Sequence, residues 1–209
     1  MIKEISNVGI VPVAAVESVD EGLRMCEALV KGNLPVIEVT FRTAAAAKLL
    51  KAASKEFPEM LLGAGTIVEQ DELKQAVDAG AKFGVAPGTN PDIIQSAQEH
   101  DFAFFPGVAN PSNIETALSL GCKVLKFFPA EAVGGVKLLK AMIAPYRHKG
   151  VMFCPTGGIS TDNMKDYLSI KEVFAVGGSW MVNDSLIGNW DEMTRVAQAA
   201  VDQAKSIKY

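Results

Sequence analysis

Short apolar segments recur along the chain, and each is followed by an amphipathic segment. The apolar segments are centred near eight positions that lie 20 to 27 residues apart: Pro12, Ile37, Leu62, Val85, Phe105, Lys126, Phe153 and Phe174. Strands that alternate with helices at this pitch form βα units and a parallel sheet. Eight such units predict an α/β protein with a (β/α)₈ TIM barrel, in one domain spanning residues 1–209. The alternative is a doubly wound open sheet, but no GxGxxG motif follows the first segment.

Several elements are predicted with defined ends. Residues 19–31 form a helix that Gly32 and Asn33 end, and residues 69–79 form one that ends at Gly80. The first strand is predicted over residues 9–16. Because Pro12 cannot donate to a ladder, we expect a bulge or a strand start there.

An internal repeat supports the barrel. Residues 83–91 (FGVAPGTNP) resemble residues 102–111 (FAFFPGVANP). In each copy Pro-Gly ends a strand, and Asn-Pro then supplies an N-cap and a first helical residue. This repetition is expected of a barrel assembled from equivalent βα units.

Composition narrows the function classes. The 209 residues are 49% hydrophobic and 21% charged with a net charge of −4, which predicts a soluble globular protein. The mild acidity favours neither nucleic-acid nor anionic-membrane partners. No apolar run approaches the roughly 18 residues of a membrane span, and residues 1–4 lack a secretory pattern, so we expect a cytoplasmic protein.

The metal-binding residue types are sparse. The three cysteines are far apart without CxxC spacing, which predicts reduced thiols in the core: Cys26, Cys122 and Cys154. Only two histidines, His100 and His148, are present, so a zinc site built from several histidines is excluded. We therefore expect no metal and no cofactor.

The apolar segment of residues 124–131 (VLKFFPAE) carries a lysine, Lys126, in its middle. Desolvation of an ammonium is costly and favours the neutral amine. A neutral amine in an apolar pocket attacks ketones and forms Schiff bases. The alternative is that Lys126 extends its stem to solvent at the end of the strand.

A carboxylate interrupts the second strand in a similar way. Alternation along residues 36–42 (VIEVTFR) places Glu38, Thr40 and Arg42 on one face. A glutamate among Val and Ile is unusual, since Glu is rarely buried unpaired. The alternative to a catalytic role is an internal ion pair of Glu38 with Arg42 or Lys126 that only holds the barrel together.

Glycine-rich segments end three of the other strands. Residues 63–66 (GAGT) let backbone approach a ligand and supply the Thr66 hydroxyl, or else form a turn with an N-cap. The last two strands end in Thr156-Gly157-Gly158 and Gly177-Gly178-Ser179. Glycine-rich loops at helix N-termini bind anions, and barrels often bind phosphate after these two strands. The pair predicts a phosphorylated ligand.

Together these motifs resemble the 2-keto-3-deoxy-6-phosphogluconate aldolase family, whose members often also cleave 4-hydroxy-2-oxoglutarate. The resemblance extends from about Gly9 to Val182 and rests on residues 38–43, 63–66, 126–131, 155–159 and 177–179. It implies a metal-free class I aldolase of the Entner-Doudoroff pathway on a (β/α)₈ barrel, usually a homotrimer, acting on a small phosphorylated keto acid.

The resemblance also implies roles for individual residues. Lys126 would form the Schiff base and Glu38 would be the general acid and base. The substrate-binding set would be Arg42 and Thr66 at the pyruvate carboxylate, Gly157, Gly158, Gly178 and Ser179 at the phosphate, and Pro87, Phe128 and Thr156. Glu17 departs from the family, where a basic residue is common, and this leaves the exact substrate open. Alternatives are an aldolase for the 6-phosphogalactonate epimer, a phosphate-binding isomerase or synthase without a Schiff base, and a metabolite-binding barrel that is not an enzyme.

Overall fold

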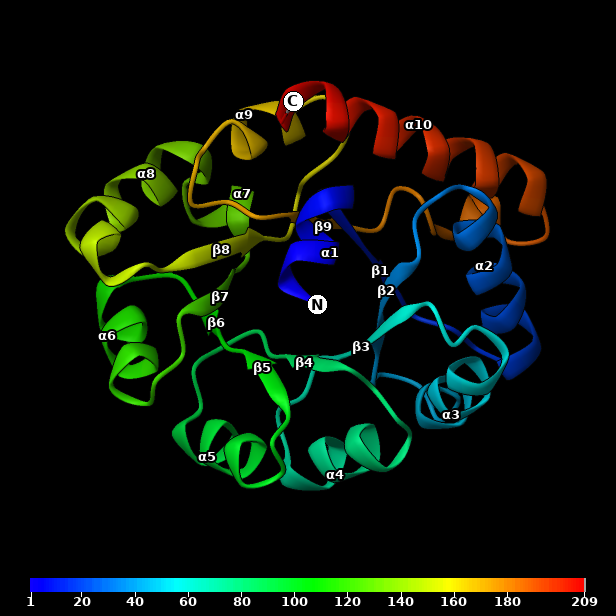
Figure 1. Ribbon diagram of the computed structural model, residues 1–209, viewed down its shortest axis with the longest axis horizontal. Coiled ribbons are helices and arrows are strands. Elements are labelled where there is room, and N and C mark those ends of the chain that lie inside the picture. Colours follow the sequence, from blue (N-terminus) through cyan, green and yellow to red (C-terminus); the bar gives the residue numbers. More distant parts are fainter. Residues whose placement is uncertain (209) are drawn as a thin grey trace.

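The computed structural model describes residues 1–208 and shows a ring of parallel strands inside a ring of helices (Figure 1). The strands are β1 (Ile10–Ala14), β2 (Val36–Thr40), β3 (Leu61–Gly65), β4 (Phe83–Val85), β5 (Ala103–Phe105), β6 (Gly107–Val108), β7 (Val124–Phe127), β8 (Met152–Pro155) and β9 (Val176–Gly178). The helices are α1 (Ile2–Val8), α2 (Val19–Lys31), α3 (Ala46–Glu56), α4 (Gln70–Asp78), α5 (Pro91–Glu99), α6 (Pro111–Ser119), α7 (Ala130–Val133), α8 (Gly135–Tyr146), α9 (Met164–Leu168) and α10 (Trp190–Lys208). Two short 3₁₀ helices, Arg147–Lys149 and Asp184–Leu186, complete the set.

The strands pair in two parallel sheets that join into a closed barrel. One sheet has the order β5-β4-β3-β2-β1-β9 and the other β6-β7-β8. Pro106 separates β5 from β6, which are two parts of one strand, and its carbonyl accepts the backbone N–H of Lys126 at 2.9 Å. At the second seam Thr156 forms a bridge with Gly177. With β5 and β6 counted once, the described residues form eight strands, and the predicted (β/α)₈ barrel is confirmed.

Three details of the strands differ from the sequence predictions. Pro12 lies in the middle of β1 rather than at its start. Pro12 is the last residue of β1 that pairs with β9, at Gly178, and the next residue, Val13, pairs with Glu38 of β2. The fifth strand, predicted to end at Pro106 and Gly107, continues past Pro106 as β6. The last strand begins at Val176, beyond its predicted centre at Phe174, because the ladder with β1 starts only there.

The predicted helix boundaries are largely confirmed. The helix of residues 19–31 has the predicted ends, and α4 lies within residues 69–79 with Glu69 as its N-cap. The two Asn-Pro pairs act as predicted, because Asn90 and Asn110 accept backbone N–H groups of α5 and α6 and a proline follows each as the first helical residue.

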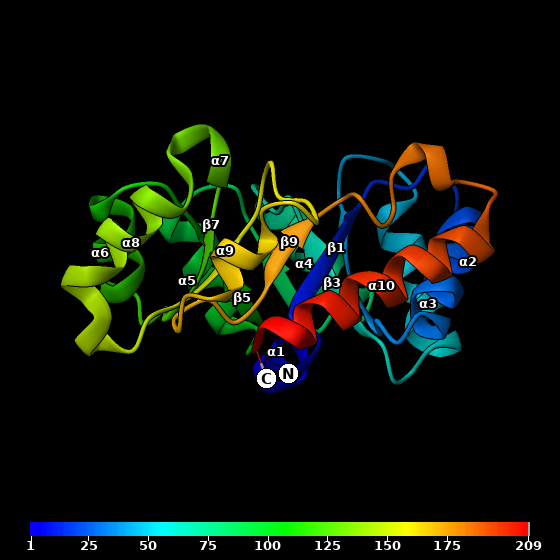
Figure 2. The same cartoon turned by 90° about the horizontal axis from the view of Figure 1, so that it is seen from above.

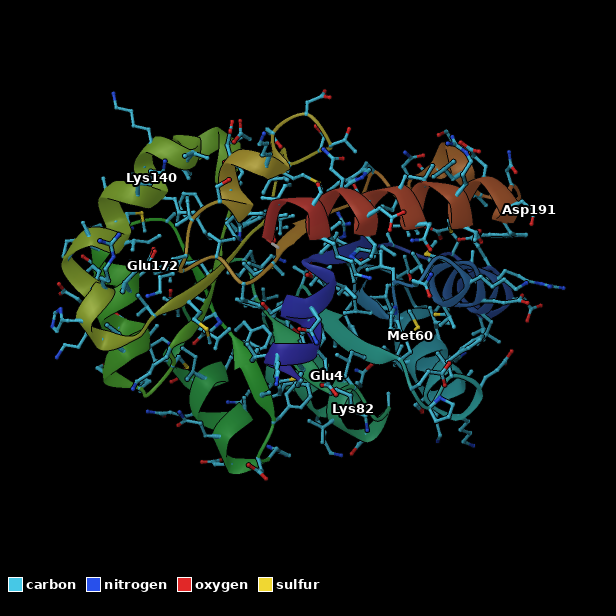
Figure 3. The ribbon with its side chains drawn as sticks, turned by 45° about the horizontal axis from the view of Figure 1, so that its top comes forward. Glu4, Met60, Lys82, Lys140, Glu172 and Asp191 are labelled. Carbon is cyan, nitrogen blue, oxygen red and sulfur yellow. The ribbon has the colours of Figure 1, made fainter. Side chains whose placement is uncertain are left out.

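The barrel has two different ends. The strands run from the end where α1 lies toward the end where α7 lies (Figure 2). The N-terminal helix α1, which the sequence pattern did not predict, lies across the centre of the ring in Figure 1, and its Ile5 is fully buried. Charged side chains such as Lys140 and Asp191 lie on the outer helices (Figure 3). No helix in residues 1–208 combines the length and the apolar character needed to cross a membrane.

Candidate active site

Lys126 and Glu38 meet inside the barrel, on strands that lie on different sides of it. The Nζ atom of Lys126 donates to Oε1 of Glu38 at 2.9 Å and to Oε2 at 3.1 Å. Only 7% of Lys126 and 3% of Glu38 is exposed. Of the two ion pairs considered from the sequence, the structure therefore contains the one with Lys126. Arg42 instead donates from Nε to Oγ1 of Thr40 at 3.3 Å.

An apolar cavity lies below this pair. Its lining combines Lys126, Glu38, Cys154 and Thr156 with apolar side chains, namely Ile5, Val11, Phe83, Val85, Phe105 and Phe174. The phenylalanines form a connected floor, since the Phe83 and Phe105 rings stack with centroids 5.4 Å apart and Phe105 meets Phe174 edge to face at 6.2 Å. Few polar groups compete there for the amine or the carboxylate, so the charge of one is compensated mainly by the other.

Glycines on β3 make room for this arrangement. A Cβ on Gly65 would lie 2.2 Å from Oε1 of Glu38, and one on Gly63 would lie 2.3 Å from the ring of Phe83. The sequence interpretation held that these glycines let a ligand approach the backbone. That interpretation is wrong for these two positions, because side chains of the protein occupy the space. Gly65 is thus needed by Glu38.

The predicted phosphate loops lie at the same end of the barrel. Gly157 and Gly158 have φ values of 103° and 76°, a region that favours glycine. Gly177, in the middle of β9, pairs with Thr156, and its missing side chain leaves room for the Thr156 hydroxyl, which a Cβ would approach to 2.3 Å. Gly178 is buried and Ser179 is exposed. The two loops are therefore brought together side by side.

The other predicted substrate residues do not line the cavity. Phe128 lies next to the amine, with its ring centroid 5.6 Å from Nζ of Lys126. Thr66 follows β3, Pro87 follows β4 and Arg42 follows β2, so all three lie at the carboxyl ends of strands, where barrel enzymes bind substrates. Glu17, three residues past the end of β1 and directly after the buried Val16, is exposed at this end.

Several members of the site were missed from the sequence. Cys154, on β8, and Thr156, directly after that strand, both line the cavity, but only Thr156 was predicted. The phenylalanine floor was missed because its rings come from strands far apart in the chain. Residues 1–208 contain no group of three or more His, Cys, Asp and Glu side chains arranged to hold a metal ion.

Known proteins share both this sequence and this geometry. The family model for KDPG and KHG aldolase matches residues 1–198. The 2-dehydro-3-deoxy-phosphogluconate aldolase of Haemophilus influenzae is 42% identical over 98% of this chain and 97% of its own length, and the KHG/KDPG aldolase of Escherichia coli is 41% identical over 94% and 92%.

Solved structures agree. The 2-keto-3-deoxy-6-phosphogluconate aldolase of Zymomonas mobilis, solved with 3-phosphoglycerate, has a TM-score of 0.89 at 38% identity, covering 96% of this chain and 94% of that one. The KDPG aldolase of Legionella pneumophila, with pyruvate captured as a covalent carbinolamine intermediate, has a TM-score of 0.91 at 36% identity, covering 95% and 97%. This chain therefore belongs to the KDPG and KHG aldolase family.

Proposed function

We propose that this chain is a class I aldolase that cleaves 2-keto-3-deoxy-6-phosphogluconate to pyruvate and glyceraldehyde 3-phosphate through a Schiff base on Lys126. The observation that carries the proposal is the buried contact of Lys126 with Glu38 above an apolar cavity. It supplies a nucleophile and a proton acceptor within hydrogen-bond distance of each other. The covalent carbinolamine in the Legionella relative supports the same chemistry here.

Glu38 activates the amine. Lys126 attacks as a neutral amine, so its ammonium first transfers a proton, and the Glu38 oxygens at 2.9 and 3.1 Å accept it. The amine then adds to the C2 keto carbon of the substrate, and a proton moves from its nitrogen to the keto oxygen to give the carbinolamine. Glu38 returns the proton to the carbinolamine hydroxyl, which leaves as water, and a C2 iminium remains.

The iminium accepts the electrons of the bond that breaks. Glu38, again a carboxylate, takes the proton of the C4 hydroxyl. The C3–C4 pair moves toward the iminium nitrogen, which leaves an enamine and releases the C4 carbonyl as glyceraldehyde 3-phosphate. The enamine takes the proton at C3 and becomes the methyl group of pyruvate. Water then hydrolyses the iminium and frees Lys126.

The remaining site residues bind the two ends of the substrate. The planar guanidinium of Arg42, with the Thr66 hydroxyl, suits the carboxylate, because its donors match two carboxylate oxygens. The phosphate is bound by Gly157, Gly158, Gly178 and Ser179, through backbone N–H groups and a hydroxyl. Pro87, Phe128 and Thr156 line the path between these ends.

Cleavage of 4-hydroxy-2-oxoglutarate to pyruvate and glyoxylate is a second candidate activity. It is supported by the name of the Escherichia coli relative, KHG/KDPG aldolase, at 41% identity. The reaction uses the same Lys126–Glu38 chemistry without a phosphate. An aldolase for the galactonate epimer and a phosphate-binding enzyme without a Schiff base gain no comparable support, because the neighbours with such names are 20% identical or less and show the fold alone.

Covalent trapping tests the proposal. Sodium borohydride added with pyruvate should reduce the iminium, abolish activity and add a pyruvyl group that maps to Lys126. Lys126→Ala should not be labelled. Lys123→Ala, which removes an exposed lysine just before the same strand, is the matched control and should label normally. A label on another lysine, or no label, would show that the Schiff base is not formed by Lys126.

The proposal extends to the state in which the protein works. We expect residues 1–209 to act as one barrel domain, in a homotrimer in the cytoplasm, as the sequence resemblance implies. Light scattering of the purified protein tests the trimer.

A further inference from the structure

Tyr167 is a buried tyrosine that the proposed reaction does not use. It lies on α9, is 0% exposed, and its hydroxyl donates a hydrogen bond to Oε1 of Glu131. Burial, together with the neighbouring carboxylate, raises the pKa of the Tyr167 hydroxyl above its ordinary value. The hydroxyl therefore stays protonated as a donor, and it fixes one oxygen of an otherwise exposed glutamate.

Glu131 in turn lies against the glycine turn after β8. Its backbone N–H donates to the carbonyl of Gly157 at 3.0 Å, and the N–H of Ala130 donates to that of Thr156 at 2.8 Å. A Cβ on Gly158 would lie 2.7 and 2.8 Å from Cβ and Cγ of Glu131. The stem of Glu131 therefore packs directly on the Cα of Gly158.

The helix that carries Tyr167 also holds the turn from a second side. Asn163, which precedes α9, donates from Nδ2 to the carbonyl of Gly158 at 2.9 Å and accepts the N–H of Ser160 at 3.0 Å. A closed set of contacts thus leads from Gly158 through Glu131 and Tyr167 along α9 and back through Asn163. Glycines at positive φ have no side chain to restrict them, so the turn depends on such contacts for its orientation.

We propose that Tyr167, acting through Glu131, is a positioning residue that fixes the Gly157–Gly158 turn for the substrate phosphate. This inference rests on the proposed function. The contact also restrains a carboxylate that lies next to the proposed phosphate site. If it were released, its charge would be free to approach and repel the phosphate. Substrates without a phosphate do not use the turn and should not depend on Tyr167.

The experiment compares two substrates. Tyr167→Phe should raise the KM for 2-keto-3-deoxy-6-phosphogluconate about tenfold, the size expected for loss of one hydrogen bond to a charged group. The KM of this variant for 4-hydroxy-2-oxoglutarate should stay within about twofold of the wild-type value. Inorganic phosphate should inhibit the variant's cleavage of 4-hydroxy-2-oxoglutarate about tenfold more weakly than that of the wild type. Tyr146→Phe is the matched control, because Tyr146 donates to Glu115 at 2.9 Å on the outer surface at the end of α8, and it should change neither KM.

Substitutions at the exposed Glu131 test the same contact without altering the core. Glu131→Ala should reproduce the loss of phosphate affinity, whereas Glu131→Gln keeps the stem and an acceptor oxygen and should largely retain it. Equal effects on the two substrates, an unchanged affinity for phosphate in Tyr167→Phe, or equal damage by Ala and Gln would overturn the inference. Borohydride trapping with pyruvate, run on the wild-type protein, needs no phosphate, so its failure would refute the proposed function and not this inference.

Discussion

Gly65→Ala tests whether the carboxylate of Glu38 must occupy its observed position. The added Cβ would lie 2.2 Å from Oε1 and 2.7 Å from Cδ of Glu38, whereas ordinary van der Waals contact begins at 3.4 Å. The carboxylate therefore has to move by about 1.2 Å, the difference between 3.4 and 2.2 Å. That shift is enough to break the hydrogen bonds to Lys126, which measure 2.9 and 3.1 Å.

The expected loss follows from that displacement. A misplacement of about 1 Å in a catalytic group costs on the order of 10²-fold in rate, or about 2.7 kcal/mol. We expect kcat for pyruvate release, coupled to NADH oxidation by lactate dehydrogenase at 25 °C, to fall by about that factor. Overpacking should also lower the Tm by a few degrees.

Gly88→Ala is the matched control. A Cβ on Gly88, in the loop after β4, would meet nothing within 4 Å, so both kcat and Tm should remain at their wild-type values. If folded Gly65→Ala retained the wild-type kcat, the position of the Glu38 carboxylate would not matter for the reaction. The base would then have to be sought elsewhere.

Three further predictions concern single residues. Glu38→Gln should keep the fold and lose 10²–10⁴-fold in kcat, roughly 3–5 kcal/mol, while borohydride still labels Lys126; near-normal kcat with a much lower Tm would mark Glu38 as only a structural partner. Two substitutions, Gly158→Ala and Ser179→Asp, should each raise the KM for the phosphorylated substrate far more than the KM for 4-hydroxy-2-oxoglutarate. The alanine at position 158 would be strained at φ 76°, and its Cβ would lie 2.7 Å from Glu131. Equal increases for the two substrates would place the phosphate elsewhere. Burial raises the pKa of the Cys26 thiol to about 12 from an ordinary value of 9.0. Above pH 9 the unfolded chain therefore loses a proton that the folded chain keeps. Between these two pKa values the free energy of unfolding should fall by about 1.4 kcal/mol per pH unit. Urea unfolding at pH 10 and pH 11 measures this slope, which should be shallower in Cys26→Ala; equal slopes would contradict it.

The elements that the sequence predicted best are those with a clear local signal. The helix of residues 19–31 has a polar N-cap at Ser18 and a glycine just past its end, and both ends were predicted. The fifth strand was predicted to end at Pro106 and Gly107, but pairing resumes beyond Pro106 in β6, because a local apolar pattern does not reveal where a ladder breaks and restarts. The seven-residue α1 gave too short a periodic signal to be identified.

Within the site, residue type was easier to predict than contact. Lys126 and Glu38 stood out because each is a charged residue in an apolar strand, yet 88 positions separate them in sequence. Their contact depends on the register of the whole barrel, which no local pattern encodes. The same holds for Gly65, which must be a glycine because the side chain of Glu38, on the neighbouring strand, occupies the place of a Cβ. Local chemistry identified the candidates, whereas only the closed barrel determined their partners.

The position of α1 determines from which end of the barrel small molecules can reach Lys126. Its Ile5 is fully buried and forms part of the lining of the cavity beneath Lys126, so that end of the barrel is sealed. Substrate, products and the hydrolytic water are then expected to reach and leave Lys126 from the opposite end of the barrel, where α7 lies (Figure 2). The pyruvate fragment stays covalently bound to Lys126 until water hydrolyses the iminium, so the aldehyde leaves first and the water enters after it. Pyruvate is thus the last product to leave.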